Sequence, residues 1–294
     1  MASFRKQSES LQAEVLSGRP LPPGWGGKLW ALEQGLEVVR RPWVVLLDAD
    51  IVLAPYVIPE LLDVAQRDSV ALVSVMAKLR CQTLWERLLV PPFIFFFKLL
   101  YPFTLVANAR SNVAAAAGGC ILVETEVLRR VGAFSQWADA LIDDCTLARQ
   151  VKRFDEHGRN ALRLFMSHDV LSTRGYEQLP EFWQMVTRTA FTQLRYSFVL
   201  LSLTTAVMGI VFAAPIAALL LGDGYSGRAV GLSGLAAMYI GFWPVARFYD
   251  LPVIWRVKLP ISATLFLAMT WHSAINYYTG TRATWKSRHY DSKA

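Results

Sequence analysis

Apolar residues in the first two thirds of the chain occur in two patterns. Unbroken apolar runs of five to ten residues predict buried strands, and apolar residues three or four apart predict helices with one packed face. The expected elements, in chain order, are a helix at 27–41, a strand at 43–47, a helix at 58–65, a strand at 70–79, a strand leading into a helix at 118–134, and a helix at 140–153. This alternation predicts a mixed α/β domain over residues 1–196.

The last third of the chain has a composition typical of membrane proteins. Residues 198–221 carry no charge, residues 229–246 are uncharged but short, and residues 259–279 have His272 as their only ionisable group. A helix needs roughly 20 residues to cross the hydrocarbon core of a bilayer. We therefore expect a membrane domain over residues 197–294 with three spans at these positions. The 54% content of hydrophobic residues and the mean hydropathy of +0.32 agree with this.

The basic tail conflicts with three crossings. An odd number of spans would place the tail on the side of the membrane opposite the α/β domain, but its positive charges favour the cytosolic side. The tail residues that carry this charge are Arg282, Lys286, Arg288 and Lys293. A re-entrant segment at 229–246 would resolve the conflict.

Residues 88–106 form an apolar stretch with two interpretations. Pro91, Pro92 and Pro102 interrupt a helical pattern, and Lys98 lies in its middle. If this segment crossed the membrane, the acids at 48 and 50 and those at 143 and 144 would lie on opposite sides of the bilayer. We therefore expect a segment that lies in the membrane interface and turns four apolar side chains to lipid, namely Phe93, Phe96, Phe97 and Leu100. A buried helix of the α/β domain is the alternative.

Net charge and cysteine content indicate which partners the protein binds and in which cellular compartment it lies. The formal charge of +7 comes from basic residues that flank apolar segments, which favours anionic lipid over nucleic acid as the partner. Cys81, Cys120 and Cys145 show no paired spacing, so we expect reduced thiols and a cytosolic location.

Two carboxylates follow the run at 43–47. Asp48 and Asp50 would project beyond the carboxyl end of a strand that we expect to lie inside a parallel sheet, where ligands of α/β sheets bind. Alternation along an extended chain would turn both to the same side. Such a pair suits a divalent cation that also binds substrate phosphates, although a turn cap and a solvated side chain would explain the same spacing.

A second acidic pair begins the helix at 140–153. Asp143 and Asp144 lie where carboxylates interact favourably with the helix dipole, so capping explains one of them. The other could act as a general base on an acceptor hydroxyl.

A third candidate region, residues 183–197, combines an apolar face with Arg188 and Arg195. Interfacial snorkelling or binding of a diphosphate would both use these arginines.

The order of these features resembles the membrane-bound family-2 glycosyltransferases. The resemblance rests on "GGKLWALEQG", "DAD" after a strand, "GGCILV", "DD" at a helix start and "TQLRY" before the apolar segments, and its wording is most similar to the hopene-associated glycosyltransferases. It implies an A-type, Rossmann-like nucleotide-sugar domain followed by transmembrane helices. Residues 192–196 occupy the frame of the usual Gln-x-x-Arg-Trp pattern, with Thr192 in place of glutamine and Tyr196 in place of tryptophan, which argues against a processive synthase.

The resemblance also implies a role for each residue. It makes Asp144 the base, Asp48 and Asp50 the ligands of Mg²⁺ or Mn²⁺, and Lys28 and Asp48 contacts to the nucleotide. It places Gln193, Arg195 and Tyr196 over the diphosphate. The remaining motif residues, near the acceptor or behind the reacting groups, are Gly118, Gly119 and Asp143.

Family members begin with a strand and an acidic motif for the base and ribose, which residues 1–27 do not resemble. A βα unit needs on the order of 30 residues, so we expect the domain to be incomplete at its N-terminus.

The expected function is inverting transfer of a sugar from a nucleotide-diphosphate sugar to a hydroxyl of a membrane lipid. The resemblance suggests a hopanoid acceptor and a bacterial-type inner membrane with the catalytic domain in the cytosol. A phospho-sugar transferase acting on a polyprenol lipid, a processive polysaccharide synthase and a non-catalytic homologue are alternatives.

Overall fold

The structure is a computed structural model that describes residues 13–154, 162–222, 224–280, 284–285 and 288–289. Its strands are β1 Trp43–Leu47, β2 Ile51–Leu53, β3 Leu72–Lys78, β4 Cys120–Glu124, β5 Arg163–Ser172, β6 Thr284–Trp285 and β7 Arg288–His289. Its helices are α2 Gly27–Val38, α3 Val57–Arg67, α4 Leu84–Leu100, α5 Phe103–Ala107, α6 Thr125–Arg130, α7 Asp143–Phe154, α8 Leu179–Gln193, α9 Phe198–Met208, α10 Ala214–Leu221, α11 Gly224–Phe248, α12 Val253–Arg256 and α13 Leu259–Tyr278. A 3₁₀ turn, η1, spans Ser135–Trp137, and a π-helical segment, η2 Gly209–Ala213, joins α9 to α10. The mixed α/β domain and the helices expected at 27–41, 58–65 and 140–153 are confirmed.

The sheet is mixed, and this corrects the expectation for β1. The strand order is β1-β4-β3-β5-β2, and β3 with β5 is the parallel pair among the strands described. β1 pairs antiparallel with β4 and lies at the edge of the sheet, so its placement inside a parallel sheet is wrong. Trp43 and Val45 contact one apolar layer while Val44 and Leu46 contact the other. The apolar run at 43–47 therefore correctly indicates that β1 has apolar neighbours on both faces of the sheet. It does not indicate the direction of β1 or which strands pair with it.

β5 is a strand that the hydrophobic pattern did not predict. It pairs with β3 up to Ser167, and a bulge then shifts the register so that Lys78 lies opposite Leu171. The residues after the bulge pair with β2. Since buried, half-buried and exposed residues are interspersed along β5, it lacks the unbroken apolar run that identified β1 and β3.

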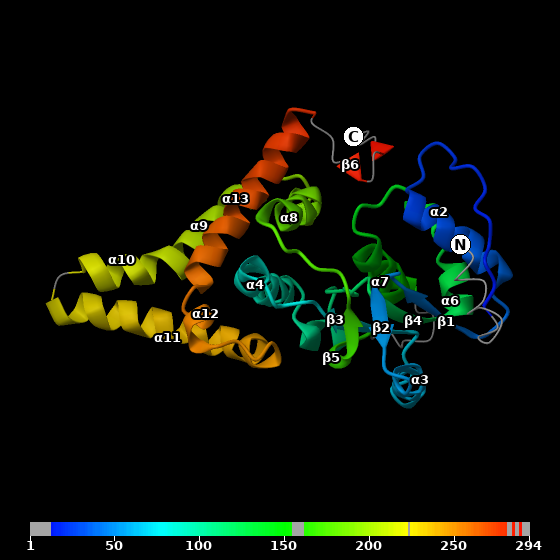
Figure 1. The fold of residues 1–294 in the computed structure, drawn as a ribbon, viewed down its shortest axis with the longest axis horizontal. Helices are drawn as coiled ribbons and strands as arrows, with labels where there is room; N and C mark the ends of the chain where they lie inside the picture. The colour runs from blue at the N-terminus through cyan, green and yellow to red at the C-terminus, as the bar shows by residue number, and fades with distance from the viewer. Residues whose placement is uncertain (1–12, 155–161, 223, 281–283, 286–287, 290–294) are drawn as a thin grey trace.

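Two helical layers cover the two faces of the sheet. α3 packs on one face through Val57, Leu61 and Ala65, against alternate residues of β3 and β4. α2, α4, α6 and α7 contribute to the larger core on the other face. In Figure 1, α3 lies apart from these helices, on the opposite side of the strands.

α4 is a single helix that is buried over much of its length, which corrects the expected orientation of Phe93 and Phe96, while an interfacial position for residues 88–106 stays a prediction. It begins with a capping box formed by Thr83 and Glu86 and continues through Pro91 and Pro92, which do not interrupt it. Phe93 stacks on Phe266 of α13 with 6.4 Å between ring centroids, and further aromatic contacts join α4 to α8, η2 and α11. Phe93 and Phe96 therefore face other helices rather than lipid, as the buried-helix alternative predicted. Leu100, at the end of α4, is exposed.

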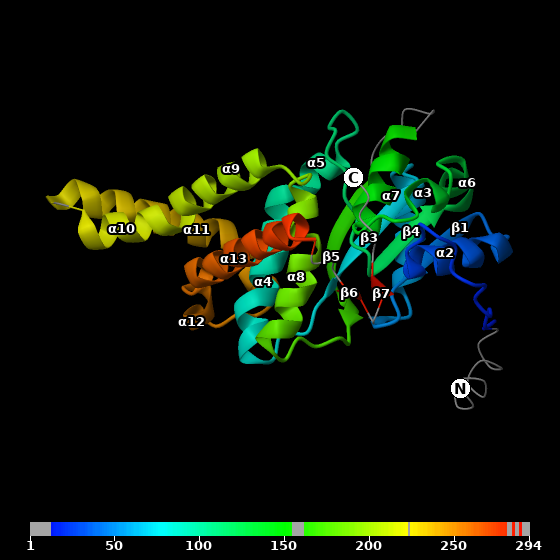
Figure 2. The same ribbon diagram turned by 90° about the horizontal axis from the view of Figure 1, so that it is seen from above.

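The C-terminal helices include an apolar hairpin that extends from the α/β domain (Figures 1 and 2). Two helices in the described part of the chain have the length and composition to cross a membrane, Phe198–Leu221 and Gly224–Phe248, with mean hydropathies of 2.2 and 1.5. The first coincides with an expected span, and the second extends the short segment at 229–246 to 25 residues. Little of either helix is covered by the rest of the protein, since 11% and 28% of their most apolar windows are buried.

The third expected span, residues 259–279, forms α13 but is not among these two helices. α13 runs beside α8 and α4, where Leu259, Ala263, Phe266 and Met269 are buried. The basic tail residues Arg282, Lys286 and Lys293 lie outside the described residues. Two crossings would return the chain to the side of the α/β domain. The contacts of Tyr277, in the last turn of α13, with Phe191 and Tyr196 agree with this, because they place the end of α13 beside the end of α8.

Close backbone packing holds the two arms of the hairpin together. Gly231 of α11 lies against α10, and a Cβ atom added to it would lie 2.6 Å from the Leu219 nitrogen and 2.8 Å from the Pro215 oxygen. Gly227 and Gly234 have similarly close neighbours across the hairpin. Such glycine-lined contacts let helices in lipid pack at short range, because apolar side chains alone do not drive association there.

We expect Gly231→Ala to destabilise the hairpin by about 1–3 kcal/mol, the usual cost of overpacking. Gly209→Ala is the matched control, since a Cβ atom there meets nothing within 4 Å and alanine favours a helix. Thermal unfolding in one detergent should lower the Tm for Gly231→Ala and leave it equal or raised for Gly209→Ala. A Tm unchanged by Gly231→Ala would contradict the packing.

Candidate active site

The predicted acids gather where β1 ends and β4 begins. Leu47 pairs with Cys120, so the end of β1 lies beside the start of the antiparallel strand β4. The Asp48 amide donates a hydrogen bond of 3.1 Å to the Gly119 carbonyl. The expectation that Asp48 lies beyond the carboxyl end of a strand is confirmed, and the antiparallel pairing adds Gly118 and Gly119 to the same edge.

Lys28 connects two acidic motifs that lie far apart in the sequence. It is in the first turn of α2, and its Nζ atom is 3.0 Å from Asp48 Oδ1 and 3.0 Å from Asp143 Oδ2. Burial lowers the pKa of Lys28, but the two carboxylates more than compensate and raise it above its ordinary value. Lys28 is therefore a fixed positive charge that holds the start of α7 against the end of β1.

Asp144 lies next to this ion-pair cluster and faces the glycines. Its Oδ2 atom accepts a hydrogen bond of 2.8 Å from the Gly118 amide, and its Oδ1 atom accepts one of 2.7 Å from the Cys145 amide. A Cβ atom on Gly118 would lie 3.2 Å from Asp144 Oδ2, so a larger residue there would require the carboxylate to shift by a few tenths of an ångström. Burial and the neighbouring charge of Asp143 raise the pKa of Asp144 to about 6. A carboxylate with such a pKa can take up a proton near neutral pH.

Asp50 has different partners from Asp48. Its Oδ2 atom accepts a hydrogen bond of 2.8 Å from Ser172 Oγ at the end of β5, and its carbonyl accepts one of 2.8 Å from the Thr173 amide. The chain turns between the two acids, with the Ile51 amide bonded to the Asp48 carbonyl. Strand alternation is therefore not what positions them, which corrects the geometric reason given for the pair.

The two acids still have the donor chemistry of a magnesium or manganese site. No cluster of three or more histidine, cysteine, aspartate or glutamate side chains occurs among the residues that the structure describes. Mg²⁺ is commonly held by one or two carboxylates together with waters and substrate phosphates, so a pair of aspartates suffices. Asp48 and Asp50 each have one oxygen beyond those used in the bonds above.

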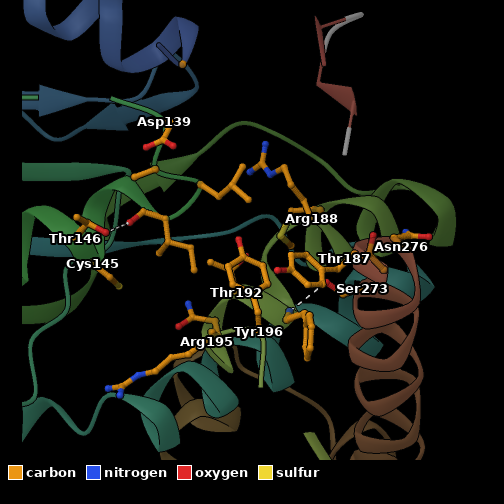
Figure 3. Close-up of a pocket in the computed structure, with 18 of the residues that line it drawn as sticks. Asp139, Cys145, Thr146, Thr187, Arg188, Thr192, Arg195, Tyr196, Ser273 and Asn276 are labelled. Carbon is orange, nitrogen blue, oxygen red and sulfur yellow. Dashed lines mark hydrogen bonds between the residues drawn. The ribbon is translucent and has the colours of Figure 1, made fainter. Parts of the chain in front are cut away.

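A large cavity of about 2150 Å³ lies beside this cluster. Gly26, Ile142 and Cys145 line it, and each is within two residues of Lys28, Asp143 or Asp144, which are not themselves lining residues. Figure 3 shows Cys145 and Thr146 on one side of the cavity, opposite residues of α8 such as Thr187 and Thr192. The end of α13 closes a further side, where Ser273 accepts a hydrogen bond of 3.1 Å from the Phe191 amide.

Gln193, Arg195 and Tyr196 line the cavity where α8 ends. Gln193 Oε1 accepts a hydrogen bond of 2.5 Å from the Tyr101 hydroxyl at the end of α4. Tyr196 stacks on Tyr277, with 4.5 Å between the rings. Arg195 and Tyr196 both have left-handed backbone angles, with φ of 52° and 55°, which is uncommon for residues other than glycine. Strain of this kind often occurs at ligand-binding segments.

The structure thus forms two groups from the sequence-predicted residues. One contains Lys28, Asp48, Asp143, Asp144 and the two glycines, and the other contains Gln193, Arg195 and Tyr196. Asp50 connects the first group to β5.

Sequence reasoning missed Glu86, which positions part of the cavity wall. Its buried carboxylate accepts hydrogen bonds from the Gln82, Thr83 and Tyr176 amides, and so holds the chain after β5 against the start of α4. The spacing of Thr83 and Glu86 is the signal that could have identified it, because threonine followed three residues later by glutamate is a capping box. Its bond to Tyr176 has no sequence signal.

Comparisons with known proteins agree with this geometry. The family model described as glycosyltransferase like family 2 matches residues 14–197, a range that contains both groups of predicted residues. Among solved structures, the chain is similar in fold to the mannosyltransferase PcManGT from Pyrobaculum calidifontis, determined in complex with GDP-Man and Mn²⁺. The TM-score is 0.50 at 17% identity, over 96% of this chain and 74% of that chain. No curated protein sequence matches the chain. Because the family model covers well over half of the 294 residues, the chain belongs to the glycosyltransferase-like family 2.

Proposed function

We propose that this glycosyltransferase moves a sugar from a nucleotide-diphosphate sugar to a hydroxyl of a membrane lipid, with inversion at the anomeric carbon. The observation that supports this best is the environment of Asp144. Its carboxylate is bound by two backbone amides, has a pKa raised to about 6, and lies at the start of a helix that lines a large cavity.

In this mechanism Asp144 acts on the acceptor. The acceptor hydroxyl gives its proton to the Asp144 carboxylate as its oxygen forms a bond to the anomeric carbon. The bond between that carbon and the diphosphate oxygen breaks on the opposite face, so the nucleoside diphosphate leaves with the electron pair. The Gly118 and Cys145 amides fix the carboxylate for this transfer.

The donor is held by groups on both sides of the cavity. Lys28 supplies a positive charge beside Asp48, and Gln193, Arg195 and Tyr196 lie on the α8 side, where the planar guanidinium of Arg195 suits a diphosphate. Asp48 and Asp50 would hold Mg²⁺ or Mn²⁺, which neutralises charge on the departing diphosphate. The similar fold of a protein determined with GDP-Man and Mn²⁺ supports this choice of donor and metal.

The apolar hairpin supports a membrane location. Two spans that pack through glycines would anchor the chain and place the catalytic domain and the end of α13 on one side. Free cysteines agree with a cytosolic domain on an inner membrane. The acceptor would then reach the cavity from the bilayer. A hopanoid acceptor is supported by the sequence resemblance alone.

The experiment that tests this proposal compares membrane lipids from cells that produce the wild-type chain or Asp144→Asn, by mass spectrometry. We expect one lipid class to gain the mass of a single sugar in the wild-type sample alone. Release of a nucleoside monophosphate would instead indicate a phospho-sugar transferase, and long polymer would indicate a synthase. No new lipid mass in any sample would contradict lipid glycosylation.

The pH dependence of kcat/KM should report the titration of Asp144. Because the base must be ionised, kcat/KM should fall about tenfold per pH unit below about pH 6. Asp143→Asn removes a negative charge that raises the pKa of Asp144, so the acid limb should move to lower pH. Asp139→Asn, another acid at the cavity wall, is the matched control and should leave the limb in place. A limb moved to higher pH by Asp143→Asn would contradict the assignment.

A further inference from the structure

Two arginines of α7, the helix whose first turn contains the proposed base, line the cavity. Arg149 and Arg153 are both exposed, and their spacing of four residues places them on one face of α7. Since a helix rises 1.5 Å per residue, they lie roughly 7 and 13 Å along its axis from Asp144. Burial raises the pKa of Tyr101, another residue that lines the cavity, and the positive charge of Arg149 partly opposes this rise.

The cavity carries more positive charge than the proposed donor site uses. Its charged lining residues, among those described, are Arg149, Arg153, Arg174, Arg188, Arg195, Asp139 and Glu181. Arg188 and Arg195 belong to the α8 side, where the leaving diphosphate is proposed to lie. Arg149 and Arg153 belong to the α7 side, which carries the base for the acceptor. An anionic group on the acceptor would meet the second pair.

The margin of the cavity near these arginines is apolar. Leu100 and Tyr101, at the end of α4, are lining residues, and Leu100 is 53% exposed. Leu99 and Leu105 are exposed beside them, on either side of the link between α4 and α5. A ligand with a charged head and acyl chains would place its head against Arg149 and Arg153 and its chains along these leucines.

We propose that Arg149 and Arg153 bind a phosphate in the head group of the acceptor, so that the acceptor is an anionic phospholipid with a free head-group hydroxyl. This rests on the proposed function, and it selects a phospholipid acceptor over the hopanoid that the sequence resemblance suggests. Arginine suits the task because its fork donates paired hydrogen bonds to phosphate oxygens, and such charge-assisted bonds are among the strongest. The phosphate holds the head group, and the hydroxyl reaches Asp144.

Calorimetric titration of the full chain in detergent tests the proposal with three soluble probes. Dihexanoyl phosphatidylglycerol has the phosphate and the hydroxyl, dihexanoylglycerol has the hydroxyl without the phosphate, and GDP represents the donor. The double variant Arg149→Gln/Arg153→Gln is compared with Arg40→Gln/Arg41→Gln, which removes the same charge at the end of α2 distant from the cavity.

We expect wild type to bind phosphatidylglycerol at least tenfold more tightly than dihexanoylglycerol. The α7 double variant should lose at least tenfold in affinity for phosphatidylglycerol while its Kd for GDP stays within twofold, and the control should match wild type. Equal binding of the two lipids, equal phosphatidylglycerol binding by variant and wild type, or weaker GDP binding instead would each overturn the proposal. Since binding needs no turnover, a failure of lipid glycosylation in the cell experiment is distinguishable from a failure of this site.

Discussion

Replacing Asp144 by asparagine should lower turnover by a factor of roughly 10² to 10⁴, the range of general acid–base catalysis. The carboxylate oxygens accept hydrogen bonds from the Gly118 and Cys145 amides, so the carboxylate is held in one orientation. An asparagine keeps the size of the side chain but cannot take up the acceptor proton. Its NH₂ group must also face one of the two amides, which adds a local structural cost.

Three measurements separate the chemical effect of Asp144→Asn from the structural one. The Tm reports the structural cost, the Kd for GDP reports the donor site, and single-turnover rates report the chemistry. Asp143→Asn is the matched variant, because Asp143 is ion-paired to Lys28 and has no hydrogen bond to Gly118. Its rate loss at neutral pH should be smaller. A near-normal single-turnover rate for Asp144→Asn would exclude Asp144 as the base.

The candidate site could be predicted from the sequence where a local motif determined the geometry. Two acids at a helix start and one acid after an apolar run were sufficient to locate Asp143, Asp144 and Asp48, because a helix start and a strand end are local features. The link through Lys28 needs α2 to lie beside β1 and α7, which is a tertiary arrangement. Only the family resemblance, and no periodicity, pointed to Lys28.

The errors in the predicted fold have a common physical origin. An apolar run reports how much of a segment is buried but not what covers it, so β1 was placed inside a parallel sheet and the aromatic face of α4 was assigned to lipid. α13 shows the same ambiguity, since several of its apolar residues are buried beside α8 and α4. Whether an apolar side chain contacts the rest of the protein or remains exposed depends on neighbours that are distant in sequence.

Asp50 illustrates how a tertiary contact can place a predicted residue differently from its local pattern. Alternation along a strand predicted that it would face the same way as Asp48, but the chain turns after Asp48, and Asp50 bonds to β5 instead. β5 had not been predicted, so neither had the contact.

Removing divalent metal with EDTA should lower activity by roughly 10³-fold, because a bound ion contributes several kcal/mol of charge stabilisation to the departing diphosphate. Mn²⁺ or Mg²⁺ should restore the activity of the wild-type chain. Asp50→Asn should not be restored by either ion, since it loses one carboxylate of a site that has two. The asparagine oxygen can still accept the hydrogen bond from Ser172, so the turn is preserved.

Ser172→Ala is the control for the metal experiment, because it removes the hydrogen bond to Asp50 but no charge. It should keep most of the activity and its response to Mn²⁺. Calorimetric titration of Mn²⁺ in the presence of GDP gives a readout that does not depend on turnover, and both Asp48→Asn and Asp50→Asn should weaken this binding at least tenfold. Full activity in EDTA would remove the metal from the mechanism. Unchanged Mn²⁺ affinity in Asp50→Asn, with weakened affinity in Asp48→Asn, would leave Asp48 as the metal ligand and assign Asp50 to holding β5 against the turn.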